Sequence, residues 1–432
     1  MSMKSKRDKT MIRLEYYRED VDRLMFFFFT SFFFKNKSSF LNRSFLPSVE
    51  LLAVLDSPIH SYPRVAAMLV PKHRETDWIF STESGHLQLL LNLPDVSRLI
   101  LIGDDPDDIS DSPAEDNDEI LEQRLKPLVV ALSPKTLTKE EEVPFLVYED
   151  NVVSRVELER SVGPCVGEMV IEDVEIEIDE GTREFRRRLR FKRMPNLVQS
   201  DVKIVRSRRG EEFEPQLTEL VHPYLAPMVA SLSLIGSELT RRPKALCVGV
   251  GGGGLLSFLK VQLGFEVTGV EIDPEVLRIA RCYFGLEERF ASVHVGDGID
   301  FLMRCSSSSC GDDDDGSKFD VLMVDLDSTD PIHGVSAPPV EFMARDVLLA
   351  ARAVLVSSGV LVINVIPPNK TFYQELKDEF RQVFAELYEI DVGNGENFVL
   401  IATVSIREGK SGFTMPNLAP VVLKYMDAIQ RI

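Results

Sequence analysis

The chain has 432 residues, a length typical of two or three domains. Hydrophobic residues make up 44% of it and charged residues 27%, a composition that excludes a disordered or fibrous protein. The 69 acidic residues outnumber the 49 lysines and arginines, which gives a formal net charge of −20. A net anion repels nucleic-acid phosphate, so we expect no nucleic-acid partner.

Cysteine and histidine are both scarce, with five and six residues in the whole chain. No two cysteines form a Cys-x-x-Cys pair, so we expect neither a disulfide framework nor a metal site. This usage is typical of a reducing compartment, and we expect a cytoplasmic protein.

The N-terminal segment contains an apolar run at residues 25–34 that is dominated by phenylalanine. Spanning a bilayer takes about 20 apolar residues, so this run is too short for a transmembrane helix, and we expect no membrane partner. It matches either the core of a targeting signal or a translated intron, since phenylalanine codons are T-rich. We therefore expect residues 1–50 to be irregular, and we assign no function to them.

Residues 51–205 predict a mostly-β α+β accessory domain. Apolar runs predict strands at 65–70, 99–102, 143–148, 168–178 and 184–191, and 87–93 predicts a short helix between the first two of them. The acidic run at 103–122 predicts a solvated loop. We expect this domain to shape a protein-substrate site or to support a homodimer.

Two polar groups stand out in this accessory region. Arg186-Arg-Arg188 lies within a predicted strand, and we expect an exposed face whose charges are offset by nearby acids. Arg74, Glu75 and Trp78 predict either an inter-domain contact or, for the single tryptophan, a core anchor.

Residues 206–240 predict a helical lead-in, because apolar side chains from Leu220 to Leu239 recur on one helical face. Strands and helices then alternate through residues 241–410. The predicted strands and helices are, in order, 245–250, 255–263, 265–270, 274–283, 293–295, 299–304, 319–324, 340–355, 360–365 and 371–384. Such alternation predicts a doubly wound parallel sheet with ligands at the carboxyl ends of its strands. We expect a surface insertion at 305–316 and a C-terminal helix within 411–432.

The end of this region distinguishes between kinds of doubly wound sheet. Two apolar stretches, 387–392 and 398–404, flank Gly393-Asn-Gly-Glu-Asn397, which predicts a β-hairpin. A nicotinamide-binding domain normally ends on parallel strands. A terminal hairpin is typical of S-adenosylmethionine (SAM)-dependent methyltransferases, and we predict their Rossmann-like α/β fold.

A glycine-rich string, residues 248–254, connects the first predicted strand of this sheet to its helix. Gly249, Gly251 and Gly253 permit a tight turn and a close approach of the backbone to a ligand. A glycine string alone also fits a flexible loop, but its place between a strand and a helix favours nucleotide binding.

Glu271 ends the next predicted strand, twenty residues beyond Gly251. Its carboxylate can accept both ribose hydroxyls of an adenosine, and Ile272 belongs to the same cofactor segment. Asp273 before Pro274 predicts a helix N-cap followed by the first helical residue. We therefore assign ribose binding to Glu271 rather than to Asp273.

Asp297 and Gly298 follow the third predicted strand. The aspartate can accept the exocyclic amine of adenine while backbone amides face the ring. Together with the glycine string and Glu271, this pattern predicts an adenosine site, although NAD and SAM both contain adenosine.

An acidic segment after the fourth predicted strand favours SAM over NAD. Asp325 and Asp327 lie where the reactive carbon and an incoming nucleophile would meet, and Asp325 also adjoins the cofactor. We expect Asn364, Pro338 and Pro339 to line the substrate side, although the two prolines also fit a plain rigid turn.

These segments carry a family resemblance. Residues 319–331 resemble the Asp-Ser-Ser-Asp-Pro segment of spermidine synthases. The chain is more similar to the C-terminal half of the methyltransferase-like protein 13 family, which modifies a lysine and the N-terminus of elongation factor 1-alpha. That likeness covers roughly residues 60–410 and includes 71–80, 143–145, 170–174, 196–200, 248–253, 270–274, 296–300, 325–331, 336–339 and 361–365.

The resemblance implies a SAM-dependent methyltransferase that acts on a protein amine, with elongation factor 1-alpha as the partner. The family's other methyltransferase half has no counterpart in this sequence. Asp325 stands two positions ahead of the part that matches spermidine synthases, so either Asp325 or Asp327 takes the catalytic place. Two alternatives stay open, namely an aminopropyltransferase that uses decarboxylated SAM and putrescine, and a catalytically inactive scaffold.

Overall fold

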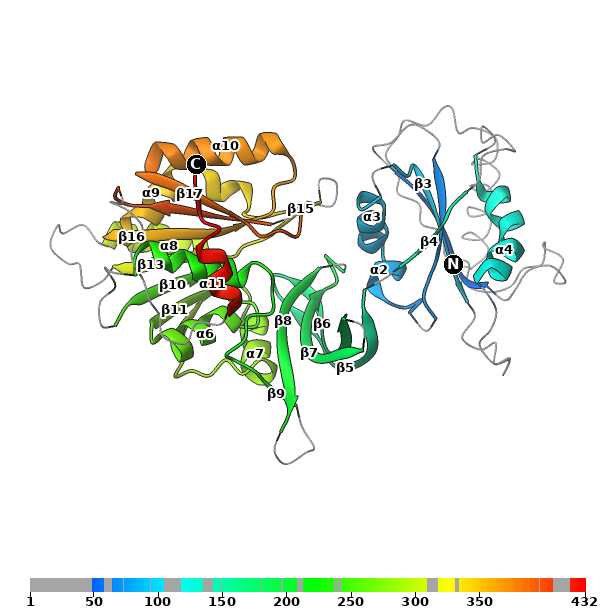
Figure 1. Ribbon diagram of the computed structural model, residues 1–432, viewed down its shortest axis with the longest axis horizontal. Coiled ribbons are helices and arrows are strands. Elements are labelled where there is room, and N and C mark those ends of the chain that lie inside the picture. Colours follow the sequence, from blue (N-terminus) through cyan, green and yellow to red (C-terminus); the bar gives the residue numbers. More distant parts are fainter. Residues whose placement is uncertain are drawn as a thin grey trace, which may run out of the picture. The chain divides into compact units, whose positions relative to one another are not determined.

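The computed structural model describes residues 49–57, 64–72, 74–93, 95–104, 118–134, 143–148, 150–179, 181–195, 197–207, 213–236, 239, 242–308, 318–330, 334–395, 397–406 and 420–432. The expectations for residues 1–48, for the insertion beyond residue 308 and for residues 411–419 lie outside this part. Contacts divide the chain into two compact units, Met1–Asp150 and Asn151–Ile432 (Figure 1).

The first unit contains a four-stranded sheet in the order β1-β3-β2-β4. The strands are β1 (Val49–Asp56), β2 (Val65–Leu69), β3 (Arg98–Asp104) and β4 (Phe145–Val147). β2 is parallel to both β3 and β4, and β1 is antiparallel to β3. The helices are α2 (Trp78–Ser81), α3 (Glu83–Leu91) and α4 (Asp118–Leu132). Side chains of α3 pack in one core cluster with one face of the sheet, and side chains of α4 pack with the other face.

One expectation for this unit needs correction. α4 begins at Asp118, inside the run that predicts a loop, because Leu121, Leu125 and Leu128 recur at helical spacing and pack on the sheet. Arg74 makes two ion pairs inside this unit. It pairs with Asp77 and Asp150, each at 2.8 Å.

The second unit contains an eight-stranded sheet in the order β12-β11-β10-β13-β16-β18-β17-β19. The strands are β10 (Lys244–Val248), β11 (Glu266–Glu271), β12 (Ala291–Val295), β13 (Phe319–Val324), β16 (Leu355–Val365), β17 (Glu386–Asp391), β18 (Phe398–Thr403) and β19 (Gln430–Arg431). The first five strands in that order are parallel, and β18 is antiparallel to both β16 and β17. The predicted terminal hairpin is therefore confirmed.

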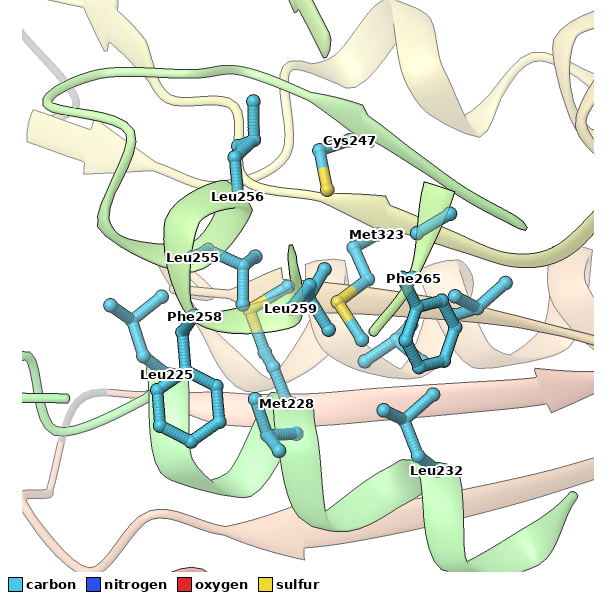
Figure 2. Close-up of a cluster of buried hydrophobic side chains, with 14 of the residues drawn as sticks. Leu225, Met228, Leu232, Cys247, Leu255, Leu256, Phe258, Leu259, Phe265 and Met323 are labelled. Carbon is cyan, nitrogen blue, oxygen red and sulfur yellow. The ribbon is translucent and has the colours of Figure 1, made fainter. Parts of the chain in front are cut away.

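Helices cover both faces of this sheet (Figure 1). They are α5 (Leu225–Ala230), α6 (Gly254–Leu263), α7 (Pro274–Tyr283), α8 (Gly298–Ser308), α9 (Arg345–Ala353), α10 (Lys370–Val383) and α11 (Pro420–Met426), with the 3-10 helices η1 (Ser231–Leu234) and η3 (Val340–Met343). Successive side chains of each strand point to opposite faces. Ala245 and Cys247 pack toward α5 and α6, whereas Leu246 and Val248 pack toward α8 to α10. Figure 2 shows the first of these clusters, with Cys247 near Leu255 and Leu256.

A five-stranded antiparallel sheet precedes this core, in the order β5-β6-β7-β8-β9. Its strands are β5 (Val152–Gly163), β6 (Gly167–Asp179), β7 (Thr182–Phe191), β8 (Val198–Arg206) and β9 (Phe213–Pro215). One face is apolar and packs on α7, where Ile171 and Val202 join Val276 and Ile279 in one cluster. The expected accessory domain at 51–205 is therefore divided between Asp150 and Asn151, because this sheet buries its apolar face in the second unit.

Asp273 holds the two parts of the second unit together. Its Oδ1 caps α7 by accepting from the Glu275 amide at 2.9 Å, which confirms the predicted N-cap. Its Oδ2 accepts from the Cys165 and Val166 amides, at 2.8 and 2.9 Å, in the turn between β5 and β6. Asp273 is fully buried, so this carboxylate is satisfied only while both parts stay together.

Three predicted helices differ from the structure. The lead-in helix is short because Pro223 disfavours the helical conformation at the preceding residue, and α5 starts only at Leu225. The segment 340–355 divides into η3 and α9, and the C-terminal helix α11 ends at Met426 instead of continuing to Ile432. Within the described residues, none of the helices combines the length and apolar character needed to cross a membrane.

Candidate functional site

The glycine loop lies at the carboxyl end of β10, in the centre of the large sheet. Gly249, Gly251 and Gly253 have φ angles of 88°, 52° and 78°, in the left-handed region that favours glycine. A Cβ at Gly249 would lie 2.1 Å from the carbonyl oxygen of Asp325. The loop thus requires glycine both for its turn and for its approach to the end of β13.

Glu271 ends β11 and orders this loop. Its Oε2 accepts from the amides of Val250 and Gly251 at 3.1 and 3.2 Å, and its Oε1 accepts from the Asp273 amide at 3.1 Å. Burial raises the pKa of Glu271, and the three amide hydrogen bonds oppose that rise. A carboxylate has about four acceptor positions, so one remains for a ligand hydroxyl. The structure thus leaves room for one ribose hydroxyl rather than the two expected from the sequence.

Ser200 of β8 also contacts the glycine loop, a role that the sequence pattern did not indicate. Its Oγ accepts from the Gly252 amide at 2.7 Å, and the residue is only 8% exposed. A Cβ at Gly251 would lie 2.8 Å from the same Oγ. The antiparallel sheet thus helps to position the loop.

The next two predicted cofactor positions follow β11 and β12. Ile272 is 46% exposed directly after Glu271, where an apolar side chain can pack on a ring. The Gly296 amide donates to the carbonyl of Glu271 at 2.8 Å, which brings Asp297 and Gly298 to the same edge. Asp297 is exposed, and its Oδ1 accepts from the Asp300 amide at 3.0 Å at the start of α8. Its Oδ2 makes no hydrogen bond with any described residue.

Asp325 follows β13, and two neutral donors hold it. Tyr224 donates to Oδ2 and the Asn364 amide donates to Oδ1, both at 3.0 Å. Burial raises the pKa of Asp325 from 3.8 to about 6, the two hydrogen bonds lower it, and the charge of Asp327 raises it. Asp325 is therefore a half-buried carboxylate whose pKa is raised to about 6.

A chain of amide side chains extends from Asp325 to the turn between β17 and β18. The Nδ2 of Asn397 donates to the Oδ1 of Asn364 at 2.9 Å, and both asparagines are buried. The Nδ2 of Asn394 donates in turn to Asn397 at 2.8 Å. The hairpin thus orients Asn364 toward Asp325.

Asp327 has a different environment. Its carboxylate pairs with the Nη2 of Arg193 at 3.3 Å, and both side chains are partly exposed, at 26% and 30%. A guanidinium neutralises Asp327, whereas uncharged groups hold Asp325. The structure therefore separates the two aspartates that the sequence left equivalent.

The two prolines lie beside the end of β16. Ala337 and Ile366 exchange backbone hydrogen bonds at 3.1 and 2.9 Å, which brings Pro338 and Pro339 near the strand end that carries Asn364. Pro338 is buried and Pro339 is half-buried.

The residues present fit an adenosyl ligand. Gly249, Gly251, Glu271 and Asp325 are linked by direct contacts at the carboxyl edge, the edge at which doubly wound sheets bind ligands. These residues provide a glycine loop, a buried carboxylate with a spare acceptor position and an exposed apolar side chain.

The order and direction of the strands in the large sheet then define the class of fold. The strand β18 is inserted between β16 and β17 and is antiparallel to both, beside the five parallel strands. The second unit thus has the Rossmann-like fold of SAM-dependent methyltransferases and of spermidine synthases.

Comparison with known proteins agrees with this class. The chain is 30% identical over 346 residues to the eEF1A lysine and N-terminal methyltransferase homolog of Drosophila melanogaster, an alignment that covers 77% of this chain and 48% of that protein. It is 27% identical over 369 residues to the eEF1A lysine and N-terminal methyltransferase of Homo sapiens, covering 78% and 51%. The chain thus spans about half the length of these relatives. No protein-family model matches the chain.

Three further likenesses are more distant. The polyamine aminopropyltransferase of Vibrio vulnificus is 29% identical over 182 residues, covering 41% of this chain and 54% of that protein. Among solved structures, human methyltransferase-like protein 13 in complex with SAH has a TM-score of 0.40 at 26% identity, covering 48% and 90%. A probable spermidine synthase from Corynebacterium glutamicum has a TM-score of 0.46 at 15% identity, covering 63% and 89%.

Proposed function

We propose that this chain is a SAM-dependent protein methyltransferase that acts on an amine of elongation factor 1-alpha, either its N-terminal α-amine or a lysine. The observation that carries the proposal is Asp325, held by Tyr224 and Asn364 beside the glycine loop. The names of the relatives support the substrate, and a substrate of the translation machinery favours a cytoplasmic location.

The residues that hold the cofactor are those at the carboxyl edge of the large sheet. Bound SAM supplies a methyl group that its sulfonium already activates. Glu271 would hold the ribose, Ile272 and Asp297 the adenine, and the loop with Gly251 the remainder. The main contribution of the protein is then to hold the nucleophile in position, an effect worth up to about 7–11 kcal/mol.

The reaction also requires that the substrate amine be unprotonated, and Asp325 can meet this requirement. Each of its oxygens accepts one hydrogen bond and keeps a second acceptor position. The carboxylate can therefore orient an incoming amine and take its proton. An unperturbed α-amine has a pKa of about 7.7–8.0 and a lysine about 10.4. A base with a pKa of about 6 can deprotonate the α-amine more readily than a lysine. We therefore propose the α-amine as the preferred target.

Aminopropyl transfer is the second candidate, and the similarity to the Vibrio enzyme favours it. Putrescine carries two cationic amines, and each needs a partner. Asp325 can serve one of them, but Asp327 is already paired with Arg193. This pairing favours a substrate with one amine at the site.

Transfer of labelled methyl from SAM into recombinant eEF1A tests the proposal. We expect wild type to label the protein and Asp325→Asn to label it at least about a hundredfold more slowly, the contribution of a general base. A wild type that binds SAM but labels nothing would support the scaffold alternative. Formation of spermidine from putrescine and decarboxylated SAM would support the aminopropyltransferase.

A further inference from the structure

One face of the antiparallel sheet carries charged side chains instead of the apolar ones that pack on α7. Most of these charges have close partners. Arg190 pairs with Glu172 at 2.7 Å, and Arg186 pairs with Glu184 at 2.6 Å. On the opposite face, Arg187 pairs with Asp173 at 2.7 Å.

Arg188 lies in the middle of this charged face and differs from its neighbours. The residue is 9% exposed, yet its Nε makes no hydrogen bond with any described residue. The nearest acid is Asp201, directly opposite on β8, whose Oδ2 lies 3.5 Å away. Burial lowers the pKa of Arg188 and the charge of Asp201 opposes this, while the charges of Arg190 and Arg186 lower the pKa further.

Two more buried atoms lack partners beside Arg188. Over the part of the chain that the structure describes, neither the Oδ1 of Asp201 nor the Nε2 of His222 makes a hydrogen bond. Burial lowers the pKa of His222, on which the charges of Asp201 and Arg188 also act. The imidazole is thus neutral at pH 7, with one nitrogen as donor and the other as acceptor.

This cluster adjoins the proposed reaction centre. The ring of His222 packs on that of Tyr224, with centroids 5.2 Å apart. Tyr224 donates in turn to Asp325. A group bound at Arg188, Asp201 and His222 would therefore lie one side chain away from the amine that Asp325 orients.

Three buried atoms without hydrogen bonds are costly, since each unsatisfied group costs about 1–3 kcal/mol. Native proteins leave few such atoms without a reason. The cluster offers a donor at Arg188 Nε and an acceptor at Asp201 Oδ1. An anionic ligand would face the charge of Asp201, and a cationic ligand would face the charge of Arg188. A neutral group with one acceptor and one donor satisfies both.

We propose that Arg188, Asp201 and His222 form a subsite for a main-chain amide of a protein substrate, next to the amine that is methylated. The peptide carbonyl accepts from Arg188 Nε, and the peptide N–H donates to Asp201 Oδ1. His222 completes the contact with either nitrogen. The inference rests on the proposed function and deepens it, because a diamine has no acceptor for Arg188 and the subsite therefore selects peptides over polyamines.

The test uses the full chain with Arg188→Lys, which keeps the charge and removes Nε–H, and with His222→Phe. Arg183→Lys is the matched control, since Arg183 lies on the same strand with a side chain 53% exposed. Labelled methyl transfer from SAM into recombinant eEF1A gives KM and kcat, and calorimetry gives the Kd of SAM. We expect each test variant to raise KM for eEF1A at least tenfold. The control should leave KM unchanged, and the Kd of SAM should change less than twofold throughout.

The outcomes separate the subsite from the proposed function. If wild type methylates eEF1A and the folded variants keep its KM, the subsite is overturned and the proposed function stands. Buried water would then be the hydrogen-bond partner of the three atoms. A wild type that binds SAM but neither binds nor methylates eEF1A overturns both. If Arg188→Lys does not fold, His222→Phe decides the question, because it removes both ring nitrogens and keeps an aromatic ring beside Tyr224.

Discussion

Tyr224 and Asp325 are 101 residues apart in the chain and share a hydrogen bond of 3.0 Å. The bond joins the start of α5 to the end of β13. It stabilises the charged form of a carboxylate, whereas burial disfavours that form. The opposing effects of burial and of this hydrogen bond on the pKa of Asp325 lead to testable consequences.

Replacement of Asp325 should affect activity far more than replacement of Asp327. We expect Asp325→Asn to lower kcat by about 10²–10⁴, the usual contribution of a general base. Asp327→Asn should lower kcat less than tenfold, because Arg193 already pairs with Asp327. Methyl transfer at saturating SAM measures both, and equal losses would contradict the assignment.

Asp325 should also make stability depend on pH. Its pKa is raised in the folded protein from 3.8 to about 6, so its contribution to stability is complete below about pH 4 and is lost as the pH rises through 6. Asp325→Asn removes that loss. At pH 7.5 we expect its free energy of unfolding to rise by up to about 3 kcal/mol, with no gain near pH 4. Urea unfolding at the two pH values measures this, and an equal change at both would show that the shift is absent.

Tyr224→Phe removes one donor from the Asp325 carboxylate. A hydrogen bond to a charged group contributes about 1.5–3 kcal/mol, so we expect the acidic limb of the kcat profile to move up by about one to two pH units. Tyr425→Phe is the control, because its hydroxyl donates to the backbone oxygen of Val392 instead. A limb that stays in place in Tyr224→Phe would remove Asp325 as the titrating group.

Glu271→Gln should weaken SAM binding. The carboxylate holds two amides of the glycine loop through one oxygen, and an amide side chain cannot accept through both of its terminal atoms. We expect the Kd of SAM in calorimetry to rise at least about tenfold, the loss of one hydrogen bond to a charged partner. Glu266→Gln, at the exposed start of the same strand, should change the Kd less than twofold, and similar effects would argue against a ribose role.

Two alanine substitutions in the glycine loop should differ sharply. Gly249→Ala places a Cβ 2.1 Å from the Asp325 carbonyl at a φ of 88°, so we expect loss of SAM binding and a thermal midpoint lower by several degrees. Gly254→Ala finds nothing within 4 Å of the new Cβ, so its thermal midpoint should stay the same or rise. Differential scanning calorimetry compares the two variants, and comparable destabilisation would mean that the loop has a different conformation.

Much of the second unit could be predicted from the sequence because its signals are local. Strand and helix periods alternate, so the parallel sheet and the placement of Glu271 and Asp325 at strand ends follow from the pattern. The Asn-Gly turn likewise identified the β17–β18 hairpin. Asp273 before Pro274 predicted the cap of α7 because capping depends on adjacent residues.

The remaining features depend on tertiary contacts that a local pattern does not contain. Tyr224 fits the apolar face of a predicted helix, and nothing near it in the chain indicates a carboxylate partner. Ser200 reaches Gly252 across 52 positions, and Arg193 reaches Asp327 across 134. The boundary at Asp150 was missed for the same reason, since strands that pack on α7 look like any other strands in sequence.

The two roles of Asp273 limit how the gene can be shortened. A fragment that begins near Glu219 would lose the amides of Cys165 and Val166 and would expose the apolar side of α7. One carboxylate oxygen would then lack its donors next to the residue assigned to the ribose. The smallest fragment suitable for crystallisation or ligand screening therefore begins near Asn151, and shorter ones should aggregate.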